Sequence, residues 1–186
     1  MSTVAKHKDN LPGAILKAVI IYDDFDSATR ATELLERVAL RVDETLKWDI
    51  KPWRGDVLKQ PTLAALTVAV AANADLIVLA LNHIHPPPAE LLDWLKNWAK
   101  HRRIKDAAVL ALPTGTSDSQ SKSWNEIKTL VEAHDLTFLG GHHVWNNDSS
   151  APFVHRLHQR KQLVAPVSRP SFAERLPVPH HCGTNE

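Results

Sequence analysis

Runs of apolar residues alternate with amphipathic segments along most of the chain. The runs at 14–22 and 75–81 show almost no polar alternation, as expected of parallel strands that are covered on both faces. Between such runs, apolar side chains recur at the three- and four-residue spacing of helices. The expected strands are Ala14–Tyr22, Trp48–Trp53, Asp75–Leu81, Ala107–Leu112 and Thr137–Leu139, and the expected helices are Ser27–Leu46, Thr62–Ala72, Ala89–Arg103 and Trp124–His134.

This alternation of strands and helices predicts an α/β fold with one doubly wound, five-stranded, mainly parallel sheet. Right-handed crossovers between parallel strands place helices on both faces of such a sheet. Pro52 has no backbone N–H to donate, so the strand at 48–53 belongs at an edge. The strand order is not fixed by the sequence alone, and 2-1-3-4-5, a common order of doubly wound sheets, is the one we expect.

The chain divides into three parts. Residues 1–13 are mixed polar and charged, lack the apolar stretch of a signal peptide, and are expected to be a flexible leader. Residues 14–143 form the α/β domain. Residues 144–186 hold five prolines and an excess of basic residues, with a short helical pattern at Phe153–Leu163. We expect this tail to be largely extended or disordered.

The charge balance and the cysteine content limit which partners and which cellular compartment we expect. The chain has 22 Lys and Arg against 21 Asp and Glu, so its net charge gives no reason to expect nucleic acid or an anionic membrane as partner. The longest apolar run, 63–81, contains Asn73 and Asp75, which argues against a membrane span. The only cysteine is Cys182, which excludes an internal disulfide and fits the reducing cytoplasm.

Polar side chains follow the predicted strands where each strand ends. In open α/β sheets the ligand crevice lies at these carboxyl ends, so the side chains found there are candidate functional groups. Carboxylate and imidazole groups are ligands for magnesium or zinc. The candidate metal ligands are Asp23, Asp24, His83, His85 and His142.

The segment VIIYDDFDSATRATELLERVA resembles the opening of a response-regulator receiver domain, in which an acidic pair closes the first strand and holds magnesium. ADLIVLAL resembles the strand that carries the phosphorylated aspartate of that family. The resemblance extends by order of elements from Ala14 to Gly141. It implies a flavodoxin-like fold and a role in signal transduction, with Asp23 and Asp24 on the acidic pair.

The chain departs from the receiver pattern at the reacting groups. The phospho-acceptor position falls on Ala80, which has no oxygen, and the amide of Asn82 two residues later is not a phosphoryl nucleophile. The family's lysine on the fifth strand has no counterpart in Thr137–His143. The resemblance therefore implies a degenerate receiver that works without phosphorylation.

Other ligand-binding motifs of α/β folds are missing from the sequence. There is no GxGxxG fingerprint, no P-loop lysine and no nucleophile elbow. The aspartates after the first strand put negative charge where a phosphate would bind. No small-molecule ligand can be named from the sequence.

Two groups of residues suggest contact with a protein. Trp94 and Trp98 are four apart on one helix, so they form either a docking patch or part of the core. The tail interleaves aromatic and basic side chains, a pattern that fits a protein partner or a second copy better than nucleic acid. The candidate tail residues are Phe153, Arg156, Arg160 and Phe172.

Two functions stay open at the level of sequence. The first is a noncatalytic, phosphorylation-independent, receiver-like regulatory module that binds a protein partner or associates with itself. The alternative is a small metal-binding protein or metal-dependent enzyme that uses the Asp and His side chains at the strand ends.

Overall fold

A computed structural model describes residues 15–42, 46–82, 86–112 and 118–140. These residues contain a five-stranded sheet of order β2-β1-β3-β4-β5 in which all four neighbouring pairs are parallel. The predicted doubly wound α/β fold and strand order are thus confirmed. The elements are β1 Ile15–Tyr22, α1 Phe25–Val42, β2 Lys47–Arg54, η1 Gly55–Lys59, α2 Pro61–Ala71, β3 Leu76–Ala80, α3 Ala89–His101, β4 Ala108–Ala111, α4 Asp118–Glu132 and β5 Thr137–Leu139.

Several element boundaries differ from those expected. Helix α1 begins at Phe25 rather than Ser27, because Asp24 caps it from the preceding turn. Helix α4 begins at Asp118 instead of Trp124, since the apolar periodicity that predicted it appears only in its second half. The 3-10 turn η1 was not expected. Pro52 lies on the edge strand β2, as predicted.

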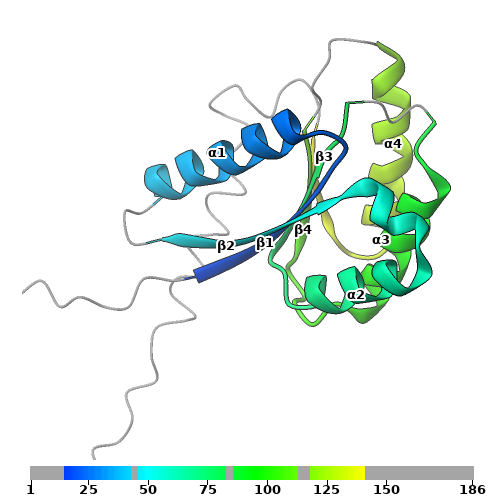
Figure 1. Cartoon of the computed structure of the whole chain (residues 1–186), viewed down its shortest axis with the longest axis horizontal. Helices are drawn as coiled ribbons and strands as arrows, with labels where there is room; N and C mark the ends of the chain where they lie inside the picture. The colour runs from blue at the N-terminus through cyan, green and yellow to red at the C-terminus, as the bar shows by residue number, and fades with distance from the viewer. Residues whose placement is uncertain (1–14, 43–45, 83–85, 113–117, 141–186) are drawn as a thin grey trace, which may run out of the picture.

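Helices cover the two faces of the sheet unequally. Helices α2, α3 and α4 lie on one side and α1 on the other (Figure 1). Alternate residues of β1 and β3 point to each side: Val19 and Ile21 join the core under α2–α4, whereas Ile20 and Val78 join the core that includes Leu35 of α1. Successive side chains of a strand point to opposite faces, so a central strand needs apolar residues at every position.

The pairing of β1 with β3 brings together the strand ends at which the candidate residues lie. The register pairs Tyr22 with Ala80, the last residue of each strand. At the opposite end, the Lys17 amide donates to the Asp75 carboxylate at 2.8 Å, and the Asp75 amide donates to the Lys17 carbonyl at 2.8 Å. These two bonds help to hold the register, and the turns after Tyr22 and Ala80 therefore meet.

Candidate functional site

The candidate site lies where β1 and β3 end side by side. After β1 the chain continues into α1 on one side of the sheet, and after β3 it continues into α3 on the other side (Figure 1). The strand order reverses between β1 and β3, which makes this the topological switch point of the fold. Asp23 and Asp24 follow β1, and Asn82 follows β3. We call these three residues the Asp–Asn cluster.

Asp24 is the N-cap of α1. Its Oδ1 accepts the Ser27 backbone N–H at 2.7 Å, its Oδ2 accepts the Ser27 hydroxyl at 3.1 Å, and its carbonyl accepts the Ala28 N–H at 3.2 Å. The first N–H groups of a helix have no partner within the helix, and a carboxylate three residues before one of them satisfies it. The sequence Asp24-Phe25-Asp26-Ser27 thus starts the helix immediately after the strand.

The hydrogen bonds to Asp24 also favour its charged form. The Ser27 backbone N–H is the largest cause of a pKa below the ordinary value for an aspartate. The Ser27 hydroxyl, the Asp23 side chain and the charge of Arg30 add to the lowering, and partial desolvation opposes it. Asp24 is therefore a carboxylate at neutral pH.

Asn82 links the acidic pair to β3. Its backbone N–H donates to Asp23 Oδ2 at 2.6 Å, and its side-chain amide donates to Asp24 Oδ2. A magnesium ion needs carboxylate oxygens that can turn toward it, and here three of these oxygens already accept hydrogen bonds from protein donors. The cluster is stabilised by neutral amide donors in the place where the receiver resemblance implies a cation.

The described residues at the end of β3, 80–82, include no nucleophile for phosphoryl transfer. Ala80 is 1% exposed and packs in the same core cluster as Ala31 and Leu35 of α1. Its methyl group offers no acceptor for a phosphoryl group. Strand β5 and the glycine that follows it, Thr137–Gly140, contain no amine to stabilise one.

A small pocket lies beside the Asp–Asn cluster, on the side of the sheet that carries α2 and α3. It has a volume of about 210 Å³, below the roughly 300–1,000 Å³ of most ligand sites. The pocket is lined by Ile21, Asp23, Arg54, Gly55, Asp56, Leu58, Lys59, Leu81, Pro88, Glu90 and Leu91.

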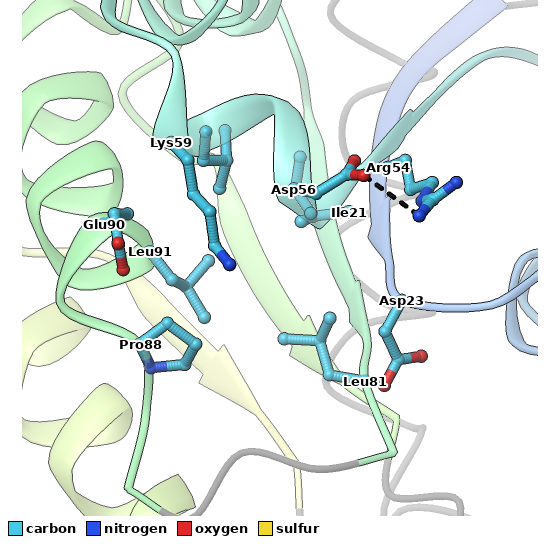
Figure 2. Close-up of a pocket in the computed structure, with 11 residues that line it drawn as sticks. Ile21, Asp23, Arg54, Asp56, Lys59, Leu81, Pro88, Glu90 and Leu91 are labelled. Carbon is cyan, nitrogen blue, oxygen red and sulfur yellow. Dashed lines mark ion pairs between the residues drawn. The ribbon is translucent and has the colours of Figure 1, made fainter.

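The charges around this pocket largely offset one another. Arg54 and Asp56 form an exposed ion pair at 3.0 Å, and the Lys59 side chain extends into the pocket between Asp56 and Glu90 (Figure 2). With Asp23, the lining holds two cations and three carboxylates. This mixture and the small volume do not select an anionic cofactor such as a nucleotide.

The predicted metal ligands are only partly placed by the structure. Asp23 and Asp24 lie together as expected, but their oxygens accept the hydrogen bonds given above. His83, His85 and His142 lie outside the described residues. Within the described residues, no group of three or more His, Cys, Asp or Glu side chains is arranged to hold a metal ion.

Of the predicted partner-binding residues, Trp94 and Trp98 are core residues. They are 3% and 0% exposed, and their rings stack 6.3 Å apart. The Trp94 indole N–H donates to the Thr67 hydroxyl at 2.8 Å, and that of Trp98 donates to the Ala71 carbonyl at 2.9 Å. Both rings join α3 to α2 and leave no face for a partner.

The remaining predicted partner residues are in the tail. Phe153, Arg156, Arg160 and Phe172 lie outside the described residues, so their role stays a prediction. No match was found among protein-family models or curated proteins. The assignment of function thus rests on the residues themselves.

One surface was missed by the sequence reasoning. Helix α2 has no ionisable residue from Pro61 to Ala71. It lies at the surface, where Leu66 and Val70 are 49% and 36% exposed. Thr62, Ala65 and Ala69 are exposed with them. We call these five residues the outer face of α2. The sequence could have indicated this surface, because Pro61–Ala71 lacks the charged residues that a surface helix ordinarily carries on its solvent side.

No helix in the described part of the chain combines the length and apolar character required to cross a bilayer.

Proposed function

We propose that this protein is a noncatalytic, phosphorylation-independent, receiver-like regulatory module that acts by binding another protein. The observation that carries the proposal is the Asp–Asn cluster. Asn82 donates from its backbone and its side chain to the two aspartates, and Ala80 occupies the position where the resemblance implies a phospho-acceptor.

Phosphoryl transfer needs parts that this end of the sheet does not offer among the described residues. The transferred group requires a nucleophile and a cation whose coordination shell stays open to it. Ala80 supplies no nucleophile, and a cation at Asp23 and Asp24 would have to displace the hydrogen bonds from Asn82 and Ser27. These facts favour a module in which the carboxyl ends of β1 and β3 stabilise the fold and take no part in phosphoryl transfer.

The outer face of α2 is the surface through which we propose that the module binds. Its side chains are neutral and mostly apolar, and Leu66 and Val70 stand one turn apart on it. A charged partner surface would lose hydration here without gaining an ion pair, so the complementary partner presents an uncharged apolar segment. A cytoplasmic setting, supported by the lone Cys182, belongs to the same proposal.

The test is capture of a partner from the source cells, followed by affinity measurements with that partner purified. Leu66→Glu places a charge on the outer face of α2 and should weaken binding at least about tenfold. Leu40→Glu is the control, because Leu40 is a leucine on α1, on the opposite side of the sheet, and is 67% exposed against 49% for Leu66. It should leave the affinity unchanged.

The same experiment separates the proposal from a phosphorylation switch. Binding should be equal with and without magnesium and a small phosphodonor. Binding that requires either reagent would overturn the noncatalytic reading, and binding that survives Leu66→Glu would overturn the assignment of the surface.

A further inference from the structure

The side of the sheet that carries α1 is wider than α1 can cover. Strands lie about 4.8 Å apart, so five of them extend about 19 Å from the axis of β2 to that of β5. A helix with its side chains is about 10 Å across. Helix α1 packs on β1, β2 and β3, which leaves β4 and β5 beyond its reach (Figure 1).

The residues on that side of β4 are nevertheless buried. Ala108, Leu110 and Leu112 are 4, 5 and 7% exposed, and they belong to the same core cluster as Val78. Leu139 of β5 packs against this cluster too. We call these five residues the β4 half-face. Among the described elements, the helices near β4 and β5 lie on the opposite side of the sheet.

We propose that the chain's own C-terminal segment, residues 153–165, forms a helix that packs on the β4 half-face and completes the second layer of the sheet. The inference goes beyond the proposed function, since it assigns part of the tail to the fold itself.

The sequence of this segment suits the role. Pro152 and Pro166 bound it, the first at a position that favours the start of a helix and the second at one that ends it. A helix of this length extends about 20 Å, which is enough to cross the roughly 13 Å of a four-residue strand. Phe153, Val154, Leu157 and Val164 would share one side of it. Arg160 and Lys161 would lie on that side too, and their long side chains can pack their apolar stems against the sheet while the charged ends reach solvent.

Chain connectivity and composition favour this segment over other parts of the chain. Residues 141–152 provide the link from the end of β5, and the helix that follows would run back along the adjacent face. Residues 1–14 and 113–117 contain few large apolar side chains and could not cover the half-face as well. In this arrangement Phe153 contacts the sheet instead of a partner.

A photo-crosslinking experiment on the full-length protein tests the contact directly. The photoreactive residue p-benzoylphenylalanine replaces Leu157 in one variant and Gln159 in another, and Gln159 would point away from the sheet. We expect cross-links from position 157, within a single chain, to peptides that contain 76–80 or 108–112. The same cross-links should be absent from position 159.

Three results would overturn the proposal. Cross-links from position 157 between two chains would assign the half-face to a second copy. Absence of cross-links from position 157 to these peptides would show that this segment does not cover the half-face, and equal labelling from positions 157 and 159 would show that there is no oriented helix.

A second measurement remains informative if the photoreactive variants fold poorly. Leu157→Glu in the full chain would place a charge against the half-face and should speed hydrogen exchange of the β4 amides about tenfold or more. Gln159→Glu adds the same charge on the outer side and should not change it. Unchanged exchange in Leu157→Glu would overturn the proposal.

Discussion

Asn82 is the residue on which the chemistry of the strand ends depends. It donates to Asp23 through its backbone and to Asp24 through its side chain, and a hydrogen bond from an amide stabilises the charged form of the carboxylate that accepts it. Asp23, Asp24 and Asn82 lie together at the carboxyl ends of β1 and β3. Their hydrogen bonds could not be predicted, because they depend on the β1–β3 register and on side-chain rotamers.

Replacing the amide of Asn82 by a carboxylate should convert the cluster into a cation site. Asn82→Asp brings a third carboxylate against Asp23 and Asp24, and we expect it to lower the free energy of unfolding by about 1–3 kcal/mol. Millimolar magnesium should recover part of this loss, because an ion that binds only the folded state stabilises it. Thermal unfolding with and without magnesium measures both effects.

Asn82→Ala is the control for this experiment. It removes the side-chain donor without adding charge, so it should lower stability and show no response to magnesium. A wild-type protein whose unfolding temperature rises with magnesium would contradict the structural role given to the cluster.

Residue spacing alone could not decide whether Trp98 lies in the core or at the surface. Its four-residue spacing from Trp94 suited both a docking patch and a core, and only the position of α2 decides between them. Trp98→Phe removes the donor to the Ala71 carbonyl and should lower the free energy of unfolding by about 2 kcal/mol. Asn97→Ala, at an exposed position on the same helix, should change it by less than about 0.5 kcal/mol. Urea unfolding compares the two, and equal stability for both variants would contradict the core assignment.

At the scale of the elements, the capping and first-turn residues determine where a helix begins, and the periodicity of apolar residues does not. Helix α1 begins at its cap, and helix α2 begins at Pro61 in the first turn, where the missing N–H costs nothing. The start of α4 was placed too late, since Asp118 to Ser123 is polar and reads as a loop until the rest of the helix is present. The spacing of apolar residues therefore predicted the presence of each helix more accurately than its first residue.

The cap of α1 should make stability depend on pH. The lowered pKa of Asp24 means that its stabilising effect is complete above the ordinary aspartate pKa of about 3.9 and is lost as the pH falls through the lowered value. Asp24→Asn should therefore be less stable than wild type at pH 7, with a difference that narrows below about pH 4. Thermal unfolding across this range measures the difference.

Asp26→Asn is the matched control for the cap, because it removes a carboxylate from the same turn of α1 and leaves the Ser27 contacts intact. A difference between Asp24→Asn and wild type that stays constant from pH 7 to pH 3 would contradict a charged cap.

At the scale of the whole molecule, the fold could be predicted from the sequence, but the function could not. The near-continuous apolar runs of β1 and β3 predicted central parallel strands, and Pro52 predicted an edge strand; both are observed. A doubly wound α/β fold is compatible with many functions, and what a site can do depends on a few side chains. Here the decisive ones are Ala80 and Asn82.

The measurement that most directly tests the central claim is the intact mass of the full-length protein after incubation with magnesium and acetyl phosphate. Our account predicts an unchanged mass, because Ala80 offers no acceptor and the acidic pair is held by Asn82 and Ser27. Gain of one phosphoryl group that is labile to hydroxylamine, and that disappears in Asp23→Ala or Asp24→Ala, would contradict the account and show that the cluster performs receiver chemistry.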